Sequence, residues 1–355
     1  MEATVRLPID WLPWEVIHAS MLMLGSRTLA RLGSSSSFFR QLVPRVVSEA
    51  CARYGALHLT KLHGLTSLGL SLAEERFSAV MKELTKLKSL IKRGKECAGA
   101  IHGLRMLLGE SGVDGGILIA AGVVEPFIRV LKSGGVKDKH AAARALRKLV
   151  VGWDERKAIL AHAGVIEPLV ELLKHGDVRG KGYAAFALGA LADRSEERMA
   201  AMSDHGAIPA LVQLLATGEV WDQRAAATTL GSLADRSEVR SQEAVDGGAI
   251  PLLVALLEGA DAKGRKAPAF ALGSLAVGSQ ERCSMIIAHG AVPTLVELLQ
   301  NGDPEDKGYA SRALLHLLPC QNMRATQASA IVATRSECPI PDDEFRDKLQ
   351  ISKSR

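Results

Sequence analysis

The sequence has few aromatic residues, and its cysteines follow no recognisable pattern. Phe, Trp and Tyr make up 4% of its 355 residues, whereas hydrophobic residues as a whole reach 47%. The five cysteines are scattered, odd in number and without Cys-x-x-Cys spacing, which argues against a disulfide framework or a metal site. Free thiols in a reducing compartment fit this usage better. Ala, Leu and Gly dominate instead, and that composition suits closely packed helices.

Long hydrophobic runs are also missing. The most apolar N-terminal stretch, 12–24, contains Glu15 and His18, and no run reaches the about 18 residues that a membrane-spanning helix needs. No charged segment followed by an uninterrupted apolar segment opens the chain, as a secretion signal would. We therefore expect a soluble intracellular protein, cytoplasmic or nuclear, with no membrane span.

Motifs for catalysis are missing as well. None of the ten histidines is paired with Cys or a carboxylate at ligand spacing. The glycine-rich stretch 112–116 does not follow a predicted strand, so it is a poor candidate for a phosphate-binding loop. We expect no enzyme activity, no metal and no cofactor.

What the sequence does contain is an internal repeat with a period of 42 residues. A glycine followed by two apolar residues and a nearby proline recurs at Gly122, Gly164, Gly206, Gly248 and Gly290. An Ala-Leu or Thr-Leu pair recurs with the same period, starting at 145, 187, 229, 271 and 313. An arginine does so at Arg156, Arg198, Arg240 and Arg282. Three features in one register over nearly 200 residues establish the repeat.

Each repeated feature has a local structural reason. The glycine closes a short helix, where the chain needs the left-handed conformation, and the proline suits the first turn of the next helix. Ser195, Ser237 and Ser279 are placed to cap the following short helices. The recurring arginine then lies in the first turn, where we predict a solvated residue that pairs with a nearby Glu. The alternative is a row that binds an anionic partner.

The pattern also predicts the long helix of each repeat. We expect these helices to stack with Ala142, Ala184, Ala226 and Ala310 at their close contacts. Pro268 should delay the start of the fourth to near Ala267, because proline is not tolerated deep inside a helix. The predicted ranges are 137–151, 179–193, 221–235, 263–277 and 305–318.

One unit is repeated over 122–318: a short helix, a sharp bend, a medium helix and a long helix. This unit resembles the armadillo repeat. The Gly-Ala-Ile-Pro bend divides the first helical unit in two, which disfavours a two-helix HEAT repeat. The resemblance implies an all-α fold, a right-handed α-α superhelix (armadillo-repeat solenoid) whose long helices line a concave groove, as in importin alpha and beta-catenin. It also implies a non-enzymatic scaffold that binds a protein or an extended peptide.

The flanking segments complete the predicted domain organisation. The array covers 77–319, with a degenerate first repeat at 77–121 and further repeats that start at 122, 164, 206, 248 and 290. A connecting helical segment at 51–76 precedes it, and a disordered tail at 320–355 follows. Within 1–50, a Leu-Pro start, leucines at helical spacing and two phenylalanines before Leu42 resemble an F-box. That resemblance implies a Skp-type adaptor and a substrate-recognition subunit of an SCF-type ubiquitin ligase; the alternative is a helical cap.

The armadillo resemblance also marks ten positions for the partner-binding groove. Importin alpha binds peptide with Asn on the long helix and Trp one turn earlier. The positions that match Asn hold Lys148, Ala190, Ser232, Ser274 and His316. The positions that match Trp hold Arg144, Phe186, Thr228, Phe270 and Arg312. Since neither Asn nor Trp occurs there, binding of nuclear-import signals is not expected.

Charge is concentrated near the start of the array. Residues 82–157 hold 16 Lys or Arg against 8 Asp or Glu. Such a surplus favours an acidic partner, with Arg144 and Lys148 exposed and Arg147 partly covered. A solvated basic face is the plain alternative. RNA or phosphoinositide binding by 82–157 is a second one, although only Phe127 and Trp153 could stack on bases. Nucleic acid is therefore not the expected partner.

Overall fold

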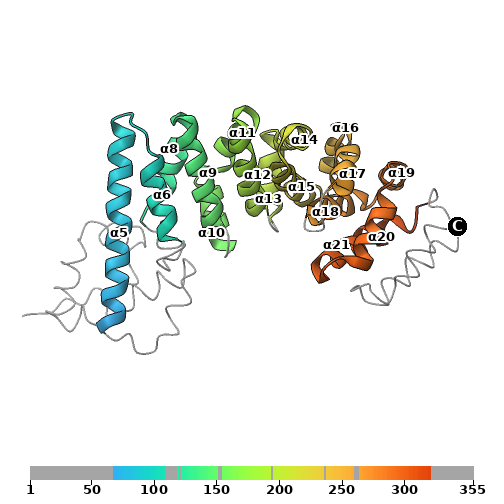
Figure 1. Cartoon of the computed structure of the whole chain (residues 1–355). Helices are drawn as coiled ribbons and strands as arrows, with labels where there is room; N and C mark the ends of the chain where they lie inside the picture. The colour runs from blue at the N-terminus through green and yellow to red at the C-terminus, as the bar shows by residue number, and fades with distance from the viewer. Residues whose placement is uncertain are drawn as a thin grey trace, which may run out of the picture. The chain divides into compact units, whose positions relative to one another are not determined.

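The computed structural model describes residues 67–108, 118–119, 121–150, 154–192, 195–235, 237–259 and 264–320, and for 67–78 and 154–155 the backbone only. Its regular elements in these ranges are helices, as predicted (Figure 1). No single described helix is long and apolar enough to cross a membrane, and only α19 (Gln280–Ala288) and α20 (Ala291–Asn301), bent by 83°, reach that length and apolarity together. The F-box-like segment, most of the connecting segment and nearly all of the predicted tail lie outside the described residues.

The described residues belong to two compact units. The first contains residues up to 126 together with 152–158, and the second contains 127–151 together with the chain from 159 onward. In the first unit, α5 (Ser67–Lys92) packs against α6 (Ala98–Leu107). α5 begins before residue 77, the predicted start of the degenerate first repeat. The proposed boundary between 76 and 77 therefore falls inside one helix.

Most of the repeat helices lie in the second unit, whereas α8 (Val124–Ser133) and α10 (Asp154–His162) are divided between the two units, and all of them follow the 42-residue period. The medium helices are α8 (Val124–Ser133), α11 (Ile166–His175), α14 (Ala207–Thr217), α17 (Ala249–Gly259) and α20 (Ala291–Asn301). The long helices are α9 (Val136–Val150), α12 (Val178–Ala192), α15 (Val220–Ala234), α18 (Lys266–Ala276) and α21 (Pro304–Leu317). The short helices are α10 (Asp154–His162), α13 (Glu196–Asp204), α16 (Glu238–Asp246) and α19 (Gln280–Ala288). The late start of α18 confirms the effect predicted for Pro268.

The ends of the helices confirm the predicted turn chemistry. All five repeat glycines have a positive φ, between 76° at Gly206 and 88° at Gly290. The hydroxyls of Ser195, Ser237 and Ser279 each accept a hydrogen bond from the backbone N–H three residues later, as N-caps do. The sharp bend and the capped short helix therefore recur as local structures with a local sequence cause.

The long helices stack directly on one another, in the order α9, α12, α15, α18 and α21. Small residues make this possible. Ala142, Ala184 and Ala226 have no exposed surface. At Gly231, a Cβ atom would lie only 2.7 Å from the Phe270 ring, so no other residue fits there without a shift. The helices can therefore approach closely enough to form a continuous face.

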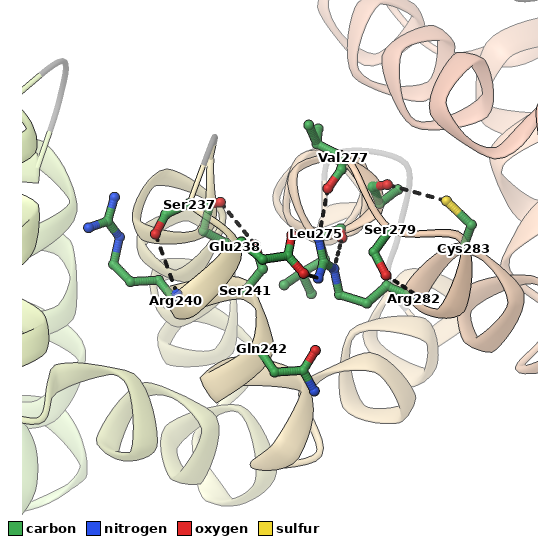
Figure 2. Close-up of polar contacts among 12 residues, drawn as sticks. Ser237, Glu238, Arg240, Ser241, Gln242, Leu275, Val277, Ser279, Arg282 and Cys283 are labelled. Carbon is green, nitrogen blue, oxygen red and sulfur yellow. Dashed lines mark hydrogen bonds and ion pairs between the residues drawn. The ribbon is translucent and has the colours of Figure 1, made fainter.

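The repeated arginines also join neighbouring repeats (Figure 2). Arg282 is 1% exposed, and its Nε donates to the Leu275 carbonyl oxygen at 2.7 Å. Its two terminal nitrogens donate to the Glu238 carboxylate, at 2.5 and 2.8 Å, and Nη2 also donates to Val277 O. Arg240 repeats the arrangement with Leu233 O and Glu196, and Arg198 repeats the bond to the carbonyl with Leu191.

The prediction that these arginines are solvated was therefore wrong, although the predicted Glu pairing is right for Arg240 and Arg282. The last carbonyl groups of a helix have no partner within the helix, and the guanidinium group satisfies them from the next short helix. The carboxylate comes from the preceding short helix, 44 residues earlier in the chain. We call this arrangement of Arg, carbonyl and Glu the arginine staple.

Candidate functional site

The long helices carry a surplus of basic residues that could attract an acidic partner. These helices hold eleven Lys or Arg: five on α9, two on α12, one each on α15 and α18, and two on α21. They hold four Asp or Glu, of which Asp138, Asp222 and Asp306 are buried. The accessible charge of the long helices is therefore strongly positive.

The ten predicted groove residues differ in their solvent exposure. Arg144, Phe186 and Thr228 are exposed. Ser274 has no exposed surface, and its hydroxyl has no hydrogen-bond partner among the described residues, so its prediction as a groove residue was wrong. The other six are partly covered: Lys148, Ala190, Ser232, Phe270, Arg312 and His316. Lys148 is thus less exposed than predicted, whereas Arg147 is partly covered, as expected.

Two arginines of α9 lie over aromatic rings of α12. The guanidinium carbon of Arg147 lies 4.5 Å from the centre of the Phe186 ring, and that of Arg144 lies 5.8 Å from the Tyr183 ring. A cation held over an aromatic face is stabilised by the ring quadrupole and keeps its hydrogen-bond donors directed outward. Neither arginine, nor Lys148 beside them, forms an ion pair within the part of the chain that the structure describes.

A third arginine also lies over an aromatic ring, at the other end of the face, and it binds a carboxylate. Arg312 of α21 lies 5.8 Å from the centre of the Phe270 ring, and its Nη2 donates to Asp235 Oδ1 at 2.5 Å. Asp235 caps α15, so the bridge joins the helices on either side of α18. An arginine over a ring thus binds a carboxylate within this chain.

A cavity of about 310 Å³ lies between α12, α15, α18 and α21. Four aromatic side chains line it: Phe186, Trp221, Phe270 and Tyr309. The Phe186 and Trp221 rings are parallel, with centres 6.4 Å apart, and the Phe270 and Tyr309 rings meet edge to face at 5.5 Å. Trp221 is 40% exposed and Phe186 37%, which is unusual for rings of this size. The cavity is therefore an apolar recess in a basic face.

The charged residues at the rim of this cavity are mostly paired with one another. Lys266 Nζ lies 2.7 Å from Glu305, 3.3 Å from Asp303 and 3.8 Å from Asp306. The hydrogen bond with Glu305 is the main reason that the pKa of Lys266 is raised. Burial raises the pKa of Asp306, one oxygen of which has no hydrogen-bond partner among the described residues. The C-terminal end of the face thus satisfies its own charges, unlike the end at α9.

Sequence reasoning missed Trp221, Tyr183 and Tyr309. Trp221 lies seven residues before the predicted position Thr228, so no match to a peptide-binding position marks it. Tyr183 and Tyr309 share one register of the repeat, but alanine fills that register in the two repeats between them. A count of the aromatic residues on the predicted long helices could have found all three. No group of three or more His, Cys, Asp or Glu placed to hold a metal occurs in the described ranges.

No protein-family model matches the sequence, and no curated protein matches it either. Solved structures do. An engineered protein from a structural genomics consortium is similar over 65% of this chain and 99% of its own, with 29% identity and a TM-score of 0.54. A computationally designed armadillo repeat protein for modular peptide recognition is similar over 67% and 99%, with 25% identity and a TM-score of 0.57. A designed armadillo repeat protein in complex with the peptide (KR)4 matches over the same shares, with 24% identity and a TM-score of 0.57.

The repeats of this chain therefore form an armadillo-repeat solenoid, and the predicted fold and the resemblance to armadillo repeats are confirmed. The likeness supports a peptide-binding or protein-binding scaffold.

Proposed function

We propose that this protein is a non-enzymatic scaffold that binds an extended, acidic segment of another protein across its long helices. The observation that carries the proposal is the pair Arg144 and Arg147, whose guanidinium groups lie over rings of α12 without an acidic partner in the described residues. Charge-assisted hydrogen bonds from arginine to carboxylate are strong and directional. Asp235 on Arg312 shows that the same arrangement accepts a carboxylate.

Two further features support an acidic partner. The long helices carry an accessible positive charge, which raises the rate at which an acidic segment reaches them. The similar designed protein at 25% identity is named for peptide recognition, which agrees with an extended ligand on such a face. Lys148 adds a third cation one helical turn from Arg144.

The first prediction is that reversing two charges on α9 removes binding. With a fluorescein-labelled (Glu-Ser)4 peptide as the probe, we expect Arg144→Glu with Lys148→Glu to weaken binding by at least about tenfold, because two cations that contact carboxylates become anions. Binding to the unmutated protein should also weaken as salt rises. Fluorescence anisotropy at low and high ionic strength measures both effects, and thermal melting should show nearly unchanged stability.

A matched control separates the site from net charge. Lys88 and Lys92 of α5 are exposed, four residues apart like Arg144 and Lys148, and without an ion pair in the described residues. Lys88→Glu with Lys92→Glu changes the net charge by the same amount, and we expect it to leave the affinity within about twofold. Salt-independent binding that survives the α9 variant would contradict the proposal.

The two other functions that the sequence suggested are separate proposals. An SCF-type subunit depends on the F-box-like segment 1–50, and binding of a purified Skp-type adaptor by the full chain tests it directly. RNA or phosphoinositide binding depends on the basic region 82–157. Both control lysines lie in that region, so loss of RNA or vesicle binding in the control variant would favour that alternative.

A further inference from the structure

We infer that the aromatic cavity binds one large apolar side chain of the same partner, so that the recognised segment combines acidic residues with an aromatic or large aliphatic anchor. The acidic half of this motif rests on the proposed function. The apolar half rests on a different observation, namely the recess lined by Phe186, Trp221, Phe270 and Tyr309. The motif is therefore bipartite.

The size and lining of the cavity suit a single side chain. Its volume of about 310 Å³ is at the low end of the roughly 300–1,000 Å³ typical of small-ligand sites. It can hold one anchor but not a folded element. Trp and Tyr, which both line this recess, are among the residue types that contribute most to binding energy at interfaces. Trp221, at 40% exposure, is the ring most available to a partner.

The charges at the rim argue for an uncharged anchor. Lys266 already has three carboxylates within 4 Å, so it offers little attraction to a further anion. Arg224 and Lys266 line the cavity together with Glu305, so the rim carries charges of both signs and favours neither a cationic nor an anionic side chain. An apolar anchor gains from the rings and loses nothing to the charges.

The position of the cavity sets the spacing of the motif. Phe186 belongs to both sites, because Arg147 lies over its ring and the ring also lines the cavity. The cavity extends from α12 to α21, so its middle lies about one to two helix spacings, roughly 10–20 Å, beyond Arg147. An extended chain advances about 3.3 Å per residue. The anchor should thus be about three to six residues from the acidic group.

The test uses labelled peptides that carry four glutamates, a Gly-Ser spacer and a phenylalanine, in both chain directions. Spacers of one, four and ten residues are compared, and each peptide has a partner with Ser in place of Phe. We expect Phe to strengthen binding by about tenfold with the four-residue spacer, in one of the two directions, and less with the others. Burial of one aromatic side chain is sufficient for a gain of this size.

Two variants test whether the gain in affinity from Phe arises in the cavity. Trp221→Ala removes a wall, and Thr228→Trp fills the space from an exposed position on the cavity lining. Both should abolish the advantage of Phe over Ser and keep the salt-dependent binding of glutamates. Val239→Ala, at a 77% exposed position on α16, is the matched apolar control and should keep the full gain. Melting curves identify any variant that fails to fold, and the second variant then decides.

The outcomes distinguish the two proposals. Equal binding of Phe and Ser peptides at every spacing and in both directions overturns the inference, while salt-dependent binding of glutamates still supports the proposed function. A peptide with Arg as the anchor that binds more tightly than the Phe peptide also overturns the inference. If Ser replaces the glutamates and the Phe peptide still binds equally tightly through Trp221, the cavity is confirmed and the acidic function is wrong.

Discussion

Single residues of the repeat have tasks that can be separated. Gly206 has φ 76°, a conformation that other residues adopt at a cost, yet a Cβ there would meet no atom closer than the Lys174 side chain at 3.5 Å. Its role is therefore conformational. Gly231 has the opposite role, since a Cβ there would approach the Phe270 ring and the Ala271 backbone. A side chain at Gly231 would push two long helices apart.

The bend glycine leads to a local prediction. Gly206→Val should cost roughly 1–3 kcal/mol through backbone strain. Because the stability of a solenoid is close to a sum of terms from each repeat and its neighbours, the damage should stay local. Hydrogen exchange should show lost protection centred on 190–225. Gly308→Val is the control, because Gly308 lies inside α21 and a Cβ there would meet no atom within 4 Å. Loss of protection spread evenly along the array would contradict a local conformational role for Gly206.

Between elements, the arginine staple joins three helices at once. Arg282 starts on α19, bonds to the end of α18 and binds the carboxylate of α16. Arg312 also bridges three long helices, but its side chain is 37% exposed and that of Asp235 is 30% exposed. The side chain of Arg282 is 1% exposed although that of Glu238 is 66% exposed, so the two ion pairs have the same chemistry and differ in the burial of the guanidinium group. That difference decides their contribution to stability.

Removing the buried arginine should be the more damaging change. We expect Arg282→Met to lower the free energy of unfolding by about 3–5 kcal/mol, because it leaves two carbonyl groups without their donor inside the interface. Arg312→Met should cost about 1 kcal/mol or less, since that pair is half-solvated. Urea denaturation of both variants measures the difference. Equal losses would show that the staple contributes no more than a surface ion pair.

For the molecule as a whole, carboxyl groups with opposite pKa directions set the response to acid. Hydrogen bonds from Arg240 and Arg282 lower the pKa of Glu196 and Glu238, whereas burial raises that of Asp222 and Asp306. A carboxyl with a lowered pKa stabilises the fold above its unfolded-state value, about 4.3, and this stabilisation is lost as pH falls through the folded-state value. A carboxyl with a raised pKa destabilises the fold at neutral pH, and this destabilisation is relieved as pH falls through its folded-state value.

Comparison of one variant with the unmutated protein measures the contribution of a carboxyl group whose pKa is lowered. Glu238→Gln should be less stable than the unmutated protein at pH 7, and the gap should narrow below about pH 4 as Glu238 itself is protonated. Thermal melting between pH 7 and pH 3 measures the gap. Glu243→Gln is the control: Glu243 lies on the same helix, and Ser203 donates to it at 3.3 Å. A gap that stays constant down to pH 3 would contradict the pKa direction of Glu238.

Much of the architecture could be predicted from the sequence, because its causes are local. The period, the long helices to within three residues, the positive φ at Gly206, the Ser237 cap and the late start at Pro268 all follow from nearby residues. The burial of Arg282 could not be predicted in this way. Its carboxylate lies 44 residues away, and only the stacking of repeats brings the two together.

The site was predicted less completely than the fold. Register alone placed Arg144 and Phe186 on the exposed face, but it could not show that Arg147 would lie over Phe186. It missed Trp221, because a side chain's reach across a helix interface depends on three-dimensional packing. It also misplaced Ser274, which has no exposed surface, because the register does not show how far neighbouring helices cover a position.

The arginine staple also bears on how such an array can grow. Arg240 uses the glutamate of the preceding repeat, and the same short helix offers Glu238 to the arginine of the next one. One 42-residue unit therefore carries both halves of the contact: an arginine for the preceding repeat and a glutamate for the following one. An in-frame duplication of residues 206–247 would supply a new arginine and a new glutamate together. The array can lengthen by whole units without leaving a buried charge unpaired.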